Sequence, residues 1–267
     1  MKIHKIKNTL RSVNDFRKYV GNQLVFDAIK SNFKIELIEH VEPGRALVIA
    51  AHGDDDCFGC GGAICQHVLA ADKVKIIYLT DGSEGSEKKL SQSEKREYAQ
   101  IRERESTAAA GKLGVDDIEF WRFKDGTLAA SETIIRLVVE LFEKSRPEII
   151  YLPSFLDTHN DHAATCEIIA AALARTKMFG IKIYSYEVWS PVFANRILKI
   201  NSNIDQKKEA LKQHRSQLKS RNYLDAALGL AKYRGALTGA GDYAEAFFCA
   251  NSKLYLELFG LARYKKR

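Results

Sequence analysis

The segment that follows one apolar stretch combines a histidine, three carboxylates and several glycines. The apolar stretch covers 46–50, and His52, Asp54, Asp55 and Asp56 come directly after it. Three adjacent Asp side chains repel one another unless a proton or a cation lies between them. Together with His52 they are typical of a catalytic metal site that also supplies a base. The alternative is an acidic turn that caps a helix, which three Asp residues alone would favour.

A second segment, 157–162, places two histidines three residues apart behind the apolar stretch 148–153. His159 and His162, with Asp161 between them, can serve one metal and one reaction. One imidazole would bind the ion, and the other, oriented by a carboxylate, would polarise a carbonyl or donate a proton. The alternative is a surface turn before a helix. Because both segments follow an apparent strand, we expect them to converge.

The pattern around these segments predicts the elements that hold them. Apolar stretches predict strands over 45–51, 74–80, 117–122 and 148–152, and helical periodicity predicts helices over 60–71, 92–113, 131–145 and 162–178. This alternation is typical of parallel βαβ units with right-handed crossovers. We therefore expect an α/β, Rossmann-like fold with a mostly parallel sheet and helices on both faces. Such sheets bind ligands beyond the carboxyl ends of their strands.

Beyond residue 180 the pattern changes. It predicts strands over 181–189 and 192–200 and a helix over 205–219 that carries His214. A Ser-His-Asp hydrolase built on His214 is not supported, because the chain has no Gly-x-Ser-x-Gly turn.

In these two motifs the sequence resembles the LmbE-like (PIG-L-like) zinc-dependent de-N-acetylases. That family carries His-Pro-Asp-Asp-Glu and His-Pro-Asp-His, which here read as the segments 52–56 and 159–162. The segments 80–85, 102–105 and 214–217 look most like those of diacetylchitobiose deacetylases. The resemblance covers roughly residues 45 to 250.

The resemblance implies a role for each matching residue. His52, Asp55 and His162 would bind Zn²⁺, although the ligand types also suit Fe²⁺ or another divalent metal. Asp54 would be the general base that activates water. His159 would stabilise the tetrahedral intermediate or protonate the leaving amine, and Asp161 would orient His159.

Four further residues are implied outside that set. Arg102 and Asp125 would lie at the substrate, although an i,i+3 ion pair with Glu105 is the alternative for Arg102. Glu245 would support a histidine ligand, with an exposed salt bridge as the alternative. His214 would brace the pocket from a helix.

The sequence departs from the family pattern at three positions. Gly53 and Asn160 replace the two prolines, and Asp56 replaces Glu. None of these changes removes an expected ligand or the expected base, so they bear on fine geometry and on substrate preference.

The expected activity is a metal-dependent hydrolase that removes acetyl from an N-acetylglucosamine-type sugar or glycoconjugate. The alternatives are an amidase of a thiol-sugar conjugate, a nucleotide-sugar transferase, and a non-catalytic sugar- or nucleotide-binding α/β module. Related proteins also imply a possible homo-oligomer.

Composition fits one large domain. The chain has 267 residues, of which 46% are hydrophobic and 28% charged, which is ordinary for a globular protein. We assign 43–267 to the deacetylase domain and 1–42 to an N-terminal helical extension packed on it. No apolar run is long enough for a membrane span or a signal peptide. The odd number of cysteines, 5, favours reduced thiols and a cytoplasmic location.

Two further patterns have simple interpretations. Cys57 and Cys60 form a Cys-x-x-Cys pair that could be redox-active, but we favour two small side chains packed under the glycine turn. The net charge of +7 gathers at both ends of the chain and over 207–215, where we expect solvated surface. Because no basic motif is interleaved with aromatic residues, we expect no specific nucleic-acid partner.

Overall fold

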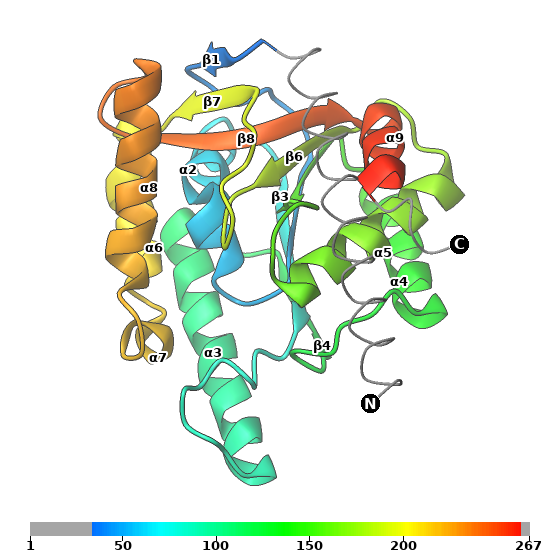
Figure 1. Cartoon of the computed structure of the whole chain (residues 1–267), viewed down its shortest axis with the longest axis vertical. Helices are drawn as coiled ribbons and strands as arrows, with labels where there is room; N and C mark the ends of the chain where they lie inside the picture. The colour runs from blue at the N-terminus through cyan, green and yellow to red at the C-terminus, as the bar shows by residue number, and fades with distance from the viewer. Residues whose placement is uncertain (1–33, 263–267) are drawn as a thin grey trace, which may run out of the picture.

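Eight strands form one central sheet in the computed structural model, which describes residues 34–262 (Figure 1). The sheet order is β1-β7-β8-β6-β5-β2-β3-β4. All neighbouring strands are parallel except at β8, which runs antiparallel to both β6 and β7. The strands are β1 (Glu36–Ile38), β2 (Ala46–Ala50), β3 (Val74–Thr80), β4 (Ile118–Phe123), β5 (Ile149–Pro153), β6 (Lys182–Tyr186), β7 (Arg196–Lys199) and β8 (Ala244–Asn251). The predicted α/β fold with a mostly parallel sheet is confirmed.

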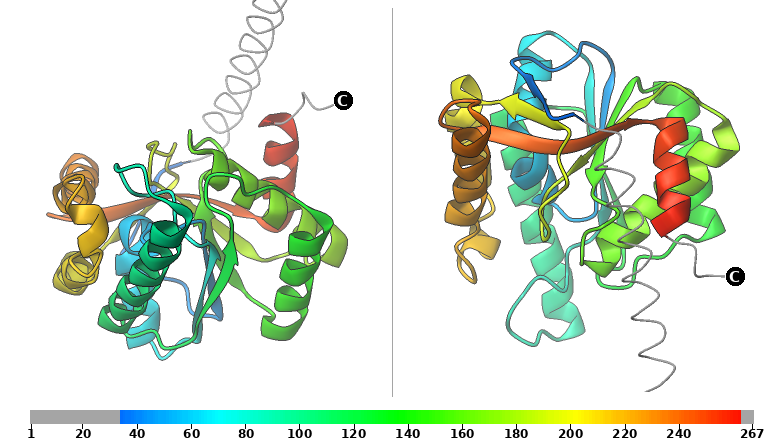
Figure 2. Two further views of the ribbon diagram at one scale, coloured as in Figure 1. Left: turned by 90° about the horizontal axis from the view of Figure 1, so that it is seen from below. Right: turned by 45° about the horizontal axis from the view of Figure 1, so that its top comes forward.

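Helices cover both faces of the sheet (Figure 2). One layer contains α2 (Asp55–Leu69), α3 (Gln92–Leu113), α6 (Ile204–Leu211) and α8 (Tyr223–Thr238), and the other contains α4 (Glu132–Ser145), α5 (Asn160–Thr176) and α9 (Ser252–Ala262). Strand β2 shows how the two cores form. Leu47 and Ile49 pack with the second layer, whereas Val48 packs with the first, because successive side chains of a strand point to opposite faces.

The chain changes direction at β2. From there it adds β3 and β4 on one side of the sheet, and β5 and β6 on the other. Strands β2 and β5 are therefore parallel neighbours, with Val48 opposite Tyr151. This is a topological switch point, where the connections leave a crevice at the carboxyl ends of the strands.

Local sequence signals fix the helix that borders this crevice. Helix α3 begins with a capping box, in which the Ser91 hydroxyl accepts from the Glu94 amide and the Glu94 carboxylate accepts from the Ser91 amide. It ends at Gly114, whose φ of 85° is left-handed. The long helix between them presents Arg102 and Ser106, both buried, to the turn after β2.

Between residues 45 and 178 the predicted elements agree with the structure to within two residues at each boundary, with one exception. Helix α2 begins at Asp55, because the acidic turn is itself the first turn of the helix. The helix predicted over 205–219 is wrong as a single element. It is interrupted at His214, which precedes the short α7 (Arg215–Leu218).

Some structure lies outside the predictions. Strand β8 and helices α8 and α9 were not predicted. The strand predicted over 192–200 is shorter in the structure, where only β7 is extended, and the 3₁₀ helix η1 (Asn201–Asn203) follows it. Strand β1 falls inside the segment assigned to a helical extension, and it pairs with β7. The rest of that extension, residues 1–33, lies outside the described residues. Between residues 34 and 262, no helix combines the length and apolar character needed to cross a bilayer.

Candidate active site

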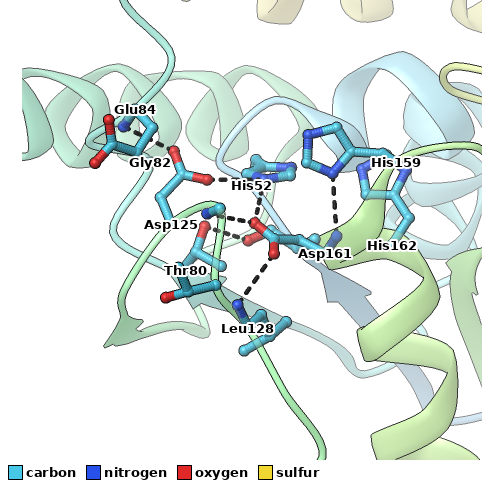
Figure 3. A network of polar contacts seen from close by, with 12 residues as sticks. His52, Thr80, Gly82, Glu84, Asp125, Leu128, His159, Asp161 and His162 are labelled. Carbon is cyan, nitrogen blue, oxygen red and sulfur yellow. Dashed lines mark hydrogen bonds and ion pairs between the residues drawn. The ribbon is translucent and has the colours of Figure 1, made fainter. Parts of the chain in front are cut away.

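The side chains singled out in the sequence meet at the carboxyl ends of three strands (Figure 3). His52 and Asp55 follow β2, Asp125 follows β4, and His159 and His162 follow β5. The adjacency of β2 and β5 brings the two sequence motifs together, so their predicted convergence is confirmed. The imidazole centroids of His52 and His159 are 4.7 Å apart, and those of His52 and His162 are 5.4 Å apart.

Asp55 lies between two imidazoles. Its Oδ1 is 3.2 Å from His162 Nε2, and its Oδ2 is 3.5 Å from His52 Nδ1. The Asp55 carboxylate also accepts a hydrogen bond of 2.8 Å from the His52 backbone amide, which fixes the turn. All three side chains are buried. Two imidazoles and one carboxylate therefore converge.

The electrostatics of this group call for positive charge. Burial works against a charged imidazole, yet Asp55 and Asp157 raise the pKa of His162 to about 9. Conversely, burial opposes ionisation of Asp55, but the two histidines hold its pKa well below the usual value. Either a proton on an imidazole or a divalent cation would supply the positive charge that stabilises these buried carboxylates.

His162 supplies a direct test of whether a metal fits. It is fully buried, and among residues 34–262 neither of its ring nitrogens has a partner with hydrogen-bond geometry, although carboxylate oxygens lie 3.2 and 3.3 Å away. Buried polar atoms rarely remain without a partner. His52, His159 and His162 also have ligand atoms within 4.8 Å of one another, as do His52, Asp125 and Asp161. The histidines and carboxylates around His52 therefore fit a divalent metal.

A second acidic group lies on the other side of His52. Its Nε2 is 3.2 Å from Asp125 Oδ1 and 3.3 Å from Asp161 Oδ2. The Asp161 carboxylate also accepts from the backbone amides of Gly126, at 2.7 Å, and Leu128, at 3.1 Å. Asp161 therefore holds the loop after β4 against His52, and these backbone contacts occupy its two oxygens.

The expected role of Asp161 is thereby corrected. Its carboxylate does not orient His159. Instead, the backbone amide of Asp161 donates to His159 Nδ1 over 3.2 Å, because His159 is the N-cap residue of α5. With Nδ1 accepting, the proton of a neutral imidazole lies on Nε2. Burial, together with the neighbouring His52 and His162, lowers the pKa of His159, which favours this neutral donor.

Asp157 is a site residue that the predictions missed. Its Oδ2 lies 3.3 Å from His162 Nδ1, its Oδ1 accepts from the His159 amide at 2.8 Å, and its Oδ2 accepts from the Trp189 amide at 3.0 Å. One buried carboxylate thus joins both histidines to the next loop. Its position two residues before His159, within the segment 157–162, is the sequence feature that could have identified it.

Asp54 and Arg102 form the pocket side of the acidic turn. Arg102 Nη2 donates to Asp54 Oδ1 at 2.9 Å, and Nη1 donates to the Gly82 carbonyl at 3.1 Å. The side chain of Asp54 makes no capping hydrogen bond with α2, so the capping alternative does not describe it. Nor does Arg102 pair with Glu105, whose carboxylate instead accepts from the amide and hydroxyl of Ser216.

The glycine that replaces a family proline has a packing reason. A Cβ added at Gly53 would lie 2.1 Å from Ser106 Oγ, which is far inside van der Waals contact. The turn therefore approaches α3 more closely than any larger residue would permit.

Asp56 and the cysteine pair lie behind the site. Asp56 is fully buried, accepts from the Tyr78 hydroxyl at 3.0 Å, and has a pKa raised by burial to about 7. Cys57 and Cys60 are free and buried, and burial raises the pKa of both thiols. The packing interpretation of the cysteines is confirmed.

Glu245 does not support a histidine, so that expectation is corrected. Helix α2 is kinked at Cys60, and Glu245 caps the segment after the kink by accepting from the amides of Gly62, at 2.7 Å, and Ala63, at 2.9 Å. Lys207 Nζ completes the cluster at 2.6 Å. Lys207 is only 1% exposed, so the expectation of a solvated basic segment was wrong at this residue.

His214 lies behind the pocket wall, at the break between α6 and α7. It is buried, its Nε2 has no hydrogen-bond partner among the described residues, and burial lowers its pKa to about 4. Its electrostatic neighbours include Asp54 and Arg102. His214 is therefore a neutral imidazole near Asp54 and Arg102, although it does not lie on the helix that was predicted.

A cavity of about 290 Å³ opens beside these groups. Its inner end contains the candidate site, and its outer end is formed by the loop after β3, the loop after β6 and the turn before α8. The lining residues are His52, Asp54, Asp55, Phe58, Glu84, Gly85, Ser86, Glu87, Arg102, Asp125, Gly126, His159, Val188, Trp189, Gln217, Ser220, Arg221 and Tyr223.

Comparison with known proteins agrees with this geometry. Residues 47–173 match the family described as PIG-L, GlcNAc-PI de-N-acetylase, which confirms the resemblance drawn from the motifs. The fold is shared with the N,N'-diacetylchitobiose deacetylase of Pyrococcus horikoshii, solved with its inhibitor MPG. The TM-score is 0.71 at 23% identity, over 79% of this chain and 85% of that chain.

Two curated relatives differ in their named activities. The "Probable N-acetyl-alpha-D-glucosaminyl L-malate deacetylase 2" of Bacillus anthracis is 27% identical over 188 residues, which are 65% of this chain and 81% of that protein. A 4-oxalmesaconate hydratase of Pseudomonas putida is 24% identical over 159 residues, which are 55% of this chain and 62% of the hydratase. The chain thus spans less than two thirds of the hydratase.

Proposed function

Because residues 47–173 match the PIG-L family, we propose that the chain is a metal-dependent hydrolase that removes acetyl from an N-acetylglucosamine-type sugar or glycoconjugate. The observation that carries this proposal is the position of Asp55 between His52 and His162, with Asp54 next to it on the cavity wall. These residues would hold Zn²⁺, to which two nitrogen ligands and one carboxylate are well suited. Bound there, the cation would polarise the acetamide carbonyl and lower the pKa of water.

The remaining steps belong to the protein's own side chains. Asp54 takes the proton of the attacking water, and the hydrogen bond from Arg102 holds the carboxylate in place. His159 presents its Nε2 proton to the carbonyl oxygen as negative charge develops there. The C–N bond of the acetamide then breaks, Asp54 passes the proton that it took from water to the leaving amine, and the acetyl group is released as acetate.

The hydratase relative suggests a second use of the same fold, and the cavity argues against it here. A polycarboxylate such as the substrate in that relative's name needs positive charge around it. The cavity instead contains five carboxylates and two guanidinium groups, contributed by Asp54, Asp55, Glu84, Glu87, Asp125, Arg102 and Arg221. An uncharged acetamido sugar suits this environment better.

Metal content and acetate release together test the proposal. Purified protein should contain about one divalent metal per chain and should release acetate from N,N'-diacetylchitobiose. Asp54→Asn should keep the metal and lose about 10²–10⁴-fold in kcat, the usual contribution of a general base. His52→Ala should lose the metal as well. Exposed Asp116 provides a matched control, and Asp116→Asn should change neither quantity.

Two results would contradict the proposal. Protein free of metal after purification and reconstitution would support a non-catalytic binding module. Turnover without free acetate would support one of the other activities, namely hydration or cleavage of a different amide.

A further inference from the structure

The outer end of the cavity carries aromatic side chains that the proposed chemistry does not use. Trp189 is 46% exposed, although tryptophan usually buries its large apolar ring. Its ring stacks on His159 at a centroid distance of 6.1 Å, and the Tyr223 ring meets it edge-on at 6.3 Å. The Arg221 guanidinium lies 5.4 Å from the Trp189 ring centroid. All four residues line the same cavity.

The backbone around Trp189 is firmly held. Asp157 accepts a hydrogen bond of 3.0 Å from the Trp189 amide. Buried Glu187, two residues before Trp189, accepts from the amide of Val192, three residues after it, at 2.8 Å and pairs with Arg234. An exposed ring on an anchored backbone loses little freedom when a ligand contacts it, which favours binding. The exposed ring of Trp189 is therefore a preformed contact surface for a ligand.

The charge of the cavity restricts what that surface can bind. Five lining side chains are carboxylates and two are guanidinium groups, so one divalent cation would still leave a negative excess. Arg221 is itself 3.9 Å from Glu87 across the opening, which offsets its charge. An anionic group attached to the sugar would be repelled. A neutral ring with hydroxyl groups can contact an aromatic face and use both Arg221 and Glu87 as hydrogen-bond partners.

We propose that Trp189, with Tyr223 and Arg221, forms a second subsite that binds a neutral, hydroxylated ring linked to the N-acetylated sugar. This proposal rests on the proposed function, since it names the part of the substrate beyond the acetamido sugar. Trp189 then determines specificity, because it lies against His159 on one side and at the cavity opening on the other. The protein should select two-ring substrates over the free monosaccharide.

Tryptophan fluorescence can test the subsite without turnover. The chain has two tryptophans, Trp121 and Trp189, so Trp121→Phe leaves Trp189 as the sole reporter. In the zinc-loaded Trp121→Phe/Asp54→Asn protein, N,N'-diacetylchitobiose should shift Trp189 emission and bind about tenfold more tightly than N-acetylglucosamine. N-acetylglucosaminyl malate, which is anionic, should bind more weakly than the neutral dimer. Equal affinities for monomer and dimer, or tighter binding of the malate conjugate, would overturn the subsite.

Kinetics separate substrate selection from support of His159. Trp189→Ala should reduce kcat/KM for the dimer about tenfold relative to the monosaccharide, and Trp189→Phe should restore most of the difference. Phe193 is a matched control, since it is 44% exposed on the same loop and does not line the cavity. Phe193→Ala should leave the ratio unchanged.

The outcomes are distinguishable from failure of the proposed function. An equal loss on monomer and dimer would show that Trp189 acts only through His159, and would overturn the subsite while leaving deacetylation intact. If the wild-type protein releases no acetate from either compound, the proposed function fails, and the fluorescence titration still decides whether Trp189 binds the second ring.

Discussion

Replacing Lys207 by methionine should destabilise the fold far more than a change of one lysine usually does. Lys207 Nζ donates to Glu245 Oε1 at 2.6 Å and to the Phe58 carbonyl at 2.8 Å. The side chains of Lys207 and Glu245 are each 2% exposed. Methionine fills a similar volume but leaves the Glu245 charge buried without its cation. Breaking a buried pair in this way costs about 3–5 kcal/mol.

The surroundings of Glu245 place the expected loss near the lower end of that range. The two backbone amides that it caps, from Gly62 and Ala63, stay in place after the substitution. They belong to the start of a helical segment, whose dipole also stabilises a carboxylate. We therefore expect a loss of about 3 kcal/mol. The effect should reach the site, since the Phe58 carbonyl precedes the kink in α2 and Phe58 lines the cavity.

Urea unfolding of the metal-loaded protein near neutral pH measures this loss directly. Lys212 is the matched control, because it pairs with Glu209 at the same 2.6 Å but is 43% exposed. Lys212→Met should cost less than about 1 kcal/mol, as exposed ion pairs usually do. The double variant Lys207→Met/Glu245→Gln removes both charges and should be less destabilised than the sum of its single changes by at least about 1 kcal/mol.

Two results would refute this reasoning. A loss below about 1 kcal/mol in Lys207→Met would place the pair in the energy range of surface contacts. Strictly additive losses in the double variant would show that the two charges do not depend on each other.

Three further predictions concern the candidate site. Gly53→Ala should cost about 1–3 kcal/mol through overpacking, because its Cβ would lie 2.1 Å from Ser106 Oγ; Ser106→Ala in the same chain should restore most of that loss in urea unfolding. Burial holds the pKa of His214 at about 4, below the unfolded value, so stability should be lost as pH falls from about 6.5 to 4, by roughly 3 kcal/mol. His214→Asn should flatten that part of the pH profile, and an unchanged slope would contradict the assignment. Asp157→Ala should weaken metal binding about 10–100-fold in chelator competition, whereas an unchanged affinity would show that its contact with His162 is not supportive.

The sequence alone located the candidate site because the relevant signals are local. Apolar runs predicted the strands that became β2 and β5, and the polar residues that follow each run are fixed by chain connectivity. The ends of parallel strands share one edge of a sheet, so His52 and His162 could be expected to meet. The exposed aromatic ring of Trp189 had no comparable local signal, because its importance depends on a cavity wall built from three loops.

The errors have a common physical cause. Lys207 has the sequence context of a solvated residue, and Glu245 has that of an ordinary strand residue. Each is buried only because α6 and β8 pack against the kink of α2, and contacts between residues so far apart in the chain depend on packing that no local pattern encodes. The same applies to Asp161, whose carboxylate contacts the loop after β4 instead of its neighbour in sequence.

The alternation of strands and helices, and the types of side chain at each strand end, can therefore be predicted from the sequence. These depend on periodicity and composition, which are properties of short segments. The tertiary structure decided which carboxylate faces which imidazole, because strand order sets those distances. In the folded chain Asp55 lies between His52 and His162. The Asp161 carboxylate contacts the loop after β4, and the Asp157 carboxylate contacts His162.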